Sequence, residues 1–98
     1  MNRAELIDRL KGCAETVKGL GATSLYLFGS AGRDEANADS DVDLFIDYDP
    51  DTRFNAFDLV GIKQFLEDRL QTHVDLTTRD GLHPMLKSDI ERDALRVF

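Results

Sequence analysis

The sequence predicts a small α/β (α+β) domain in which helices pack on one face of a mixed sheet. Of its 98 residues, 42 % are apolar, which is enough for one modest core. Three segments have apolar residues at helical spacing, and three short segments between them have the character of strands. They follow one another as helix, strand, loop, strand, helix, strand, helix. The length favours one domain over residues 1–98.

An amphipathic helix is predicted over residues 3–19. Its apolar side chains recur at steps of four and three residues, and Gly19 and Gly21 then interrupt the helix. The apolar stripe consists of Leu6, Leu10, Cys13, Val17 and Leu20. Because Cys13 lies on this stripe, we expect it to be a small buried core residue rather than a reactive thiol.

Two strands are predicted on either side of a polar loop. Residues 24–28 are a short run that ends at Gly29, and residues 31–40 are polar and rich in small side chains. Residues 42–48 alternate apolar and other side chains, so one face of this strand is apolar. The other face begins with the carboxylates of Asp41 and Asp43 and is expected to stay partly open.

The second half of the chain predicts a helix, a strand and a final helix. The first helix covers residues 53–70, with Asp51 or Thr52 as its cap, and a strand follows over residues 73–78. The last helix is expected to begin near Pro84, because proline suits the first helical turn. Its inward-facing candidates are Leu86, Ile90, Ala94 and Val97.

Composition excludes several classes of protein. A single cysteine rules out an intramolecular disulfide framework and a zinc site built mainly from cysteines. The chain has neither an apolar run of membrane-spanning length nor a signal-peptide core, so we expect a soluble, cytoplasmic protein without a membrane partner. A net charge of −7 and a pI near 4.6 argue against broad neutralisation of nucleic-acid phosphates.

The negative charge is concentrated in residues 34–51. This segment contains eight acidic residues and no Lys or Arg, so the other 80 residues together carry −7 + 8 = +1. We interpret Asp47, Asp49 and Asp51 as solvated surface or helix cap. Asp47 is the best exception, because it shares the strand face of Asp43.

A spaced pattern of glycine, serine and aspartate predicts a phosphate-handling site. Gly29-Ser30 is followed by ten residues and then by Asp41-Val42-Asp43. The two aspartates project from the same side of a strand, where a divalent cation would relieve their repulsion. Mg²⁺ binds one or two carboxylates together with substrate phosphates. Asp75 would add a third carboxylate if its strand lies beside the second strand and faces the same way.

The first part of the pattern, Gly29-Ser30, is suited to binding phosphates. Gly29 allows a sharp exit from the strand and a close approach of phosphate to the backbone. Amide N–H groups and the Ser30 hydroxyl can then bind phosphate oxygens. Arg33 is the only cationic residue between Lys18 and Arg53. By composition alone the spaced pattern would occur in roughly 1 of 200 such chains.

With Leu27 and Phe28 before it and Leu44 after it, this pattern resembles the minimal nucleotidyltransferases (MNT) of the DNA polymerase β-like superfamily. The resemblance covers essentially the whole chain and implies the nucleotidyltransferase fold. It implies that Gly29, Ser30 and Arg33 bind the nucleotide. It also implies that Asp41, Asp43 and Asp75 are catalytic and bind one or two Mg²⁺ ions with ATP.

The resemblance further implies an antitoxin of a HEPN/MNT toxin–antitoxin pair. Such an enzyme transfers AMP from ATP to a hydroxyl, typically of tyrosine, on a partner HEPN ribonuclease. The chain departs from the family pattern at Ala31 and Asp34, where the family often has Arg and Gly. Two alternatives therefore stay open: a weak or inactive antitoxin that neutralises its partner by binding, and a nucleotidyltransferase acting on a small molecule.

Overall fold

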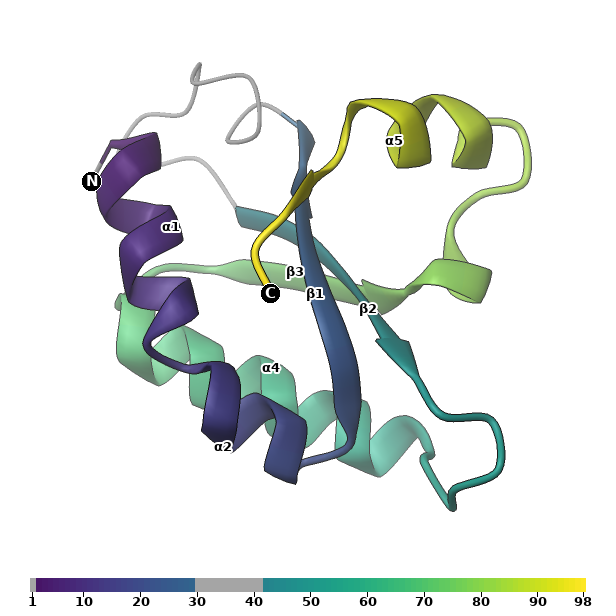
Figure 1. The fold of residues 1–98 in the computed structure, drawn as a ribbon, viewed down its shortest axis with the longest axis horizontal. Coiled ribbons are helices and arrows are strands. Elements are labelled where there is room, and N and C mark those ends of the chain that lie inside the picture. Colours follow the sequence, from purple (N-terminus) through teal and green to yellow (C-terminus); the bar gives the residue numbers. More distant parts are fainter. Residues whose placement is uncertain (1, 30–41) are drawn as a thin grey trace.

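The computed structural model describes residues 2–29 and 42–98. Figure 1 shows the helices and strands along the chain. They are α1 (Arg3–Lys11), α2 (Ala14–Gly19), β1 (Ala22–Phe28), β2 (Val42–Tyr48), α4 (Ala56–Leu70), β3 (Val74–Thr78), the 3-10 helix η1 (Arg79–Gly81), α5 (Lys87–Asp93) and β4 (Leu95–Arg96). Ser30, Arg33 and Asp41, for which the sequence predicts functional roles, lie outside the described residues.

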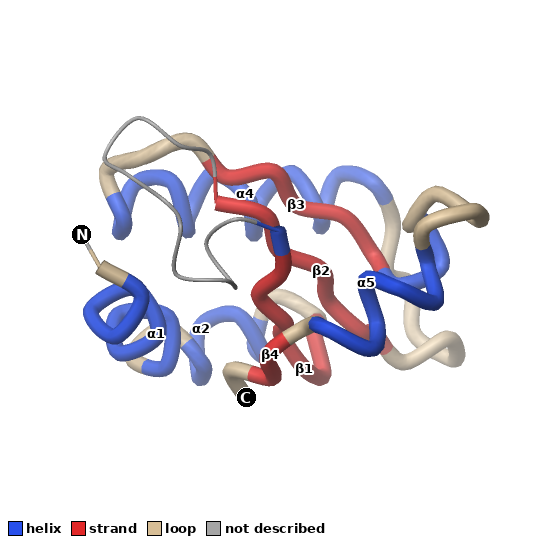
Figure 2. Tube along the Cα trace, turned by 90° about the horizontal axis from the view of Figure 1, so that it is seen from above, coloured by secondary structure: helices blue, strands red, loops and turns tan. Residues whose placement is uncertain are grey.

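The strands form one mixed sheet in the order β3-β2-β1-β4. β1 pairs antiparallel with both β2 and β4, whereas β2 and β3 are parallel. Figure 2 shows α1 and α2 on one side of this sheet and α5 on the other. The predicted α/β class with a mixed sheet is therefore confirmed. The helices were predicted on one face, and α1, α2 and α4 do pack there, whereas α5 lies over the opposite face.

The hydrophobic core lies between the sheet and helices α1, α2 and α4. Alternate residues of each strand point into it, as the period of two predicts. The buried core side chains include Leu6, Leu10, Val17, Leu25, Leu27, Leu44, Ile46, Ile62, Leu66, Leu70, Val74 and Leu76. This core fixes which strand residues face away from the helices, and among those are the candidate site residues.

The predicted helix over residues 3–19 is two helices. α1 ends at Lys11 and α2 begins at Ala14, with the break at Gly12 and Cys13. Glycine has low helix propensity, which favours a break at this position. Cys13 is buried, as predicted, and its thiol donates a hydrogen bond to the carbonyl of Arg9 at 3.3 Å. Leu20, placed on the apolar stripe by its spacing, is 40 % exposed.

The cap of α4 is Asn55, so the prediction of Asp51 or Thr52 was wrong. The Asn55 side chain accepts hydrogen bonds from the backbone N–H groups of Phe57 and Asp58, and the Asp58 carboxylate accepts one from the N–H of Asn55. This capping box satisfies backbone donors that a helix terminus leaves unpaired. Asp51 and Thr52 instead belong to a turn in which Asp49 accepts from both of their backbone N–H groups.

We predict that Asn55→Ala lowers the free energy of unfolding by about 1 kcal/mol, because the helix loses its cap. Asp51→Ala, an exposed substitution in the preceding turn, is expected to change it by less than about 0.5 kcal/mol. Urea unfolding followed by circular dichroism measures both. Equal losses in the two variants would contradict the assignment of Asn55 as the cap.

The final segment is not one helix that continues to Val97. α5 ends at Asp93, and β4 then pairs with the free edge of β1. The backbone of Leu25 pairs there with Val97 and Phe98 at 2.8 and 3.1 Å. An unpaired strand edge has unsatisfied donors and acceptors, and the short β4 satisfies some of them. Of the four predicted inward residues, only Val97 is buried; Leu86 is 53 % exposed.

Candidate active site

Three of the predicted site residues come together at one end of the sheet. β2 and β3 are parallel, and Asp43 is the register partner of Asp75. The flanking pairs, Val42 with Val74 and Leu44 with Leu76, are buried in the helix-covered core. Asp43 and Asp75 therefore project from the opposite face, on adjacent strands about 5 Å apart. Asp75 was a candidate only if its strand lies beside the strand of Asp43 and faces the same way. The structure meets both conditions.

Gly29 lies directly against the Asp43 carboxylate. The end of β1 pairs Phe28 with Asp43, and Gly29 follows with φ of +74°. This left-handed conformation favours glycine. A Cβ atom at Gly29 would overlap an oxygen of the Asp43 side chain. The position therefore favours glycine for two reasons: its backbone conformation, and the Asp43 side chain, which a Cβ would displace.

The described part of the site suits a hard metal ion and a phosphate. Asp43 and Asp75 offer carboxylate oxygens, which Mg²⁺ prefers, and Gly29 leaves the space beside them without a side chain. Within residues 2–29 and 42–98 no group of three potential ligands is close enough to hold a metal. The third predicted ligand, Asp41, is outside these ranges, as are the nucleotide-binding candidates Ser30 and Arg33.

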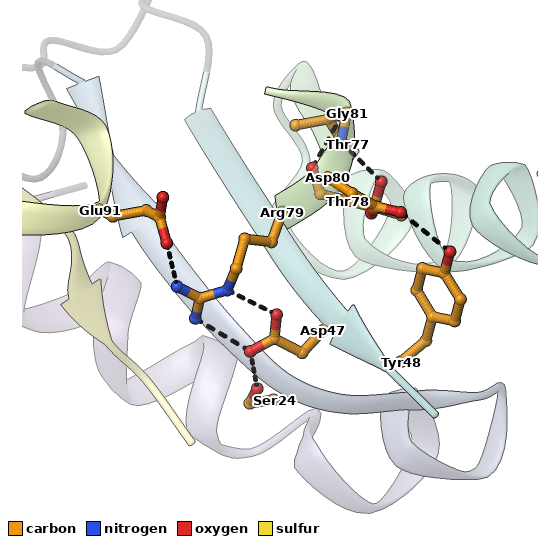
Figure 3. Close-up of polar contacts among 9 residues, drawn as sticks. All are labelled: Ser24, Asp47, Tyr48, Thr77, Thr78, Arg79, Asp80, Gly81 and Glu91. Carbon is orange, nitrogen blue, oxygen red and sulfur yellow. Dashed lines mark hydrogen bonds and ion pairs between the residues drawn. The ribbon is translucent and has the colours of Figure 1, made fainter. Parts of the chain in front are cut away.

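Asp47 forms an ion pair with Arg79, whereas the sequence favoured a solvated surface position for it. The guanidinium of Arg79 donates to both Asp47 oxygens, at 2.7 and 3.0 Å, and to Glu91 at 2.7 Å (Figure 3). The Ser24 hydroxyl donates to Asp47 at 2.9 Å. These contacts link β1, β2, the start of η1 and α5. The hydrogen bonds from Arg79 hold the pKa of Asp47 below its usual value.

Arg79 also covers a row of aromatic rings on the face of the sheet that was expected to stay partly open. Its guanidinium carbon lies 4.9 Å from the ring centre of Tyr26 and 5.1 Å from that of Phe45. Tyr26 stacks on Phe45 at 4.7 Å, and Phe45 is fully buried. Cation–π contacts therefore add to the ion pairs that hold Arg79. This face is closed over its middle and stays accessible at Asp75.

Arg79 and Glu91 were not among the residues predicted from the sequence. A usable signal was the period of two of β3 carried one residue beyond its end, because it assigns Arg79 to the face of Asp75 and Thr77. No such signal exists for Glu91, because its partner is 12 residues away across a turn. His73 shares the strand parity of Asp75, but its ring lies 3.7 Å from Glu67 of α4 and is 89 % exposed.

The ion pair of Asp47 predicts a pH-dependent contribution to stability. Because the pKa of Asp47 is lower in the folded than in the unfolded state, the contribution is complete above about pH 5. It is lost as the pH falls through the lowered folded-state pKa. We expect Asp47→Asn to unfold more readily than wild type at neutral pH, with a difference that shrinks as the solution is acidified.

Thermal melts between neutral and strongly acidic pH measure this difference. Asp51→Asn, an exposed carboxylate of the same segment, is the matched control and is expected to melt like wild type throughout. A stability gap for Asp47→Asn that stays constant down to acidic pH would show that its ionised form is not what stabilises the fold.

Comparisons with known proteins identify the family of the chain and similar folds. A family model described as a nucleotidyltransferase domain matches residues 8–97. The chain is 36 % identical over 76 residues to "Putative protein adenylyltransferase MJ0126" of Methanocaldococcus jannaschii, covering 76 % of this chain and 74 % of that protein. Its fold matches the solved structure of a "putative minimal nucleotidyltransferase" with a TM-score of 0.83 and 30 % identity, over 97 % of this chain and 95 % of that one.

A more distant structural neighbour comes from Shewanella oneidensis. It is a complex of an MNT antitoxin with a tri-AMPylated HEPN toxin, and it matches with a TM-score of 0.63 over 90 % of this chain and 68 % of that one. The two sequences are 15 % identical, so this likeness concerns the fold alone. Among the described residues, no helix is long and apolar enough to cross a membrane.

Proposed function

Because this chain belongs to the nucleotidyltransferase domain family, we propose that it is an Mg²⁺-dependent adenylyltransferase acting as an antitoxin. It transfers AMP from ATP to a tyrosine hydroxyl of a HEPN ribonuclease toxin. The observation that carries this proposal is the register pairing of Asp43 with Asp75, with Gly29 directly beside the Asp43 carboxylate.

Each site residue has a role in this reaction. Asp41, Asp43 and Asp75 would hold Mg²⁺, and the ion would supply positive charge beside the phosphates. The backbone at Gly29 and the Ser30 hydroxyl bind phosphate oxygens, and Arg33 adds a positive charge. Asp75 is exposed, so it can also orient an incoming hydroxyl and accept its proton.

The reaction is a displacement at the α-phosphorus of ATP. The acceptor oxygen forms a bond to this phosphorus while the bond to the bridging oxygen of the β-phosphate breaks. Pyrophosphate leaves, and the proton of the acceptor hydroxyl goes to Asp75. Positioning and charge neutralisation supply most of the rate enhancement in such phosphorus chemistry.

The names of similar proteins support the proposed acceptor. A relative of this chain is named as a protein adenylyltransferase, and the Shewanella complex joins an MNT antitoxin to a toxin carrying AMP groups. An acceptor on a partner protein is consistent with both observations.

The direct test uses labelled ATP, Mg²⁺ and the protein encoded by the neighbouring gene. Label should appear on a tyrosine of that protein, disappear with a chelator, and disappear with the double variant Asp41→Ala, Asp43→Ala. Absence of label on the neighbour with the wild-type protein and Mg²⁺ would refute the transfer reaction.

A second candidate function is neutralisation by binding alone. The departures at Ala31 and Asp34 favour it, because they remove a cation and add an anion near the proposed phosphate site. Under this alternative the double Asp→Ala variant would still silence the toxin in cells. Under the transferase proposal it would not.

A further inference from the structure

A pocket lies between the end of β1 and α5, next to Gly29. Its volume is about 340 Å³, within the range of about 300–1,000 Å³ that small-molecule sites occupy. It is lined by Phe28, Gly29, Leu86, Asp89, Ile90 and Asp93. Gly29 is thus shared between this pocket and the carboxylate site, so that a molecule whose phosphates lie at Gly29 can extend into the pocket.

One wall of the pocket, α5, is held by little apolar packing. Its seven residues include none that is buried. The Glu91 carboxylate, however, accepts a 2.7 Å hydrogen bond from Arg79. Arg79 is itself fixed by Asp47 and by the rings of Tyr26 and Phe45. The Arg79–Glu91 ion pair is therefore a polar link that ties α5 to the rigid part of the sheet.

We propose that Arg79 is a positioning residue that acts through Glu91: it places α5 so that the pocket binds the nucleoside part of the nucleotide. This inference rests on the proposed function, which places the phosphates at Gly29. It adds where the base and ribose lie and which ion pair shapes their site.

The chemistry of the pocket fits a nucleoside. Phe28, Leu86 and Ile90 offer apolar surface to the faces of a base. The carboxylates of Asp89 and Asp93 can accept hydrogen bonds from ribose hydroxyls or from an exocyclic amino group. Arg92 pairs with both, at 3.2 and 3.3 Å, which offsets their repulsion of nearby phosphates.

The first test measures binding of ATP and of inorganic tripolyphosphate, both with Mg²⁺, to wild type and Glu91→Gln. Tripolyphosphate has the phosphates without the nucleoside. Loss of the link should raise the Kd for ATP by about three- to tenfold. The Kd for tripolyphosphate should change by less than about twofold. If the Arg79–Glu91 ion pair had a purely structural role, Glu91→Gln would raise the Kd values for both ligands by the same factor.

A second variant tests the pocket without disturbing the ion pair. Leu86 is 53 % exposed, so Leu86→Ala should fold normally, and we expect the same selective loss of ATP binding. Met85 is 84 % exposed and does not line the pocket, which makes Met85→Ala the matched control with wild-type affinity for both ligands. In transfer assays Leu86→Ala and Glu91→Gln should raise KM for ATP more than they lower kcat.

The outcomes separate this inference from the proposed function. Two results would contradict the nucleoside site: unchanged affinity for ATP in Glu91→Gln and Leu86→Ala, or affinity for tripolyphosphate that falls as much as affinity for ATP. Neither result would contradict the transfer reaction. An increase in KM for the protein acceptor alone would assign the pocket to the acceptor and also overturn it. A wild-type protein that binds neither ligand would refute the proposed function and this inference together.

Discussion

Replacing Asp43 by asparagine is expected to reduce AMP transfer by about 10³-fold while the protein stays folded. The substitution keeps the size of the side chain but removes a charged metal ligand, and such a ligand is associated with several kcal/mol of transition-state stabilisation. Asp75→Asn should cause a similar loss, because Asp75 is the register partner of Asp43 on the same face. Single-turnover transfer of labelled AMP measures both variants.

The matched control is Asp51→Asn, which removes one charge from the same acidic segment at an exposed position. Its transfer rate should stay within about twofold of wild type. If Asp51→Asn and Asp43→Asn lost the same activity, general negative charge rather than metal binding would explain the effect. If Asp43→Asn kept full activity, the carboxylate site would be in the wrong place.

Substituting Gly29 by alanine is expected to damage both activity and stability. The new Cβ would overlap a carboxylate oxygen of Asp43, and φ of +74° is unfavourable for alanine. We expect a loss of about 1–3 kcal/mol in the free energy of unfolding. Displacement of Asp43 should also reduce transfer by about 10²-fold. Urea unfolding and the transfer assay are run on the same preparation.

Gly61→Ala is the matched control for this substitution. Gly61 lies within α4, and a Cβ there would meet nothing within 4 Å. Alanine should therefore stabilise the protein by about 0.5–1 kcal/mol through helix propensity and leave transfer unchanged. A Gly29→Ala variant as stable and active as Gly61→Ala would show that the strand end tolerates a side chain and that the close approach to Asp43 is not required.

Much of the fold was predictable because its signals are local. The strand over residues 42–48 was predicted with its observed bounds, since alternation of buried and other side chains is a property of the strand itself. The helix before β1 was predicted as one element, however, and Gly12 divides it. A helical stripe shows which side chains face the core, but it continues across a short break without losing its period.

The candidate site was predictable only as a set of residues. Spacing placed Gly29 at the end of one predicted strand and Asp43 and Asp75 within two others, and the sequence left open whether Asp75 lies beside Asp43. Strand order and register decide that point, and they depend on how the whole core packs. The cap at Asn55 was missed for a different reason: several residues before α4 can cap a helix, and the turn at Asp49 selects among them.

By itself the sequence determined the alternation that turns Asp43 and Asp75 away from the core and the glycine between strand and loop, because period and backbone freedom are encoded residue by residue. Only the tertiary structure decided that Asp43 and Asp75 are neighbours, that β4 closes the edge of β1, and that Arg79 joins Asp47 to Glu91. These contacts join residues far apart in the chain, and each forms only once the apolar faces of the helices and strands are buried together.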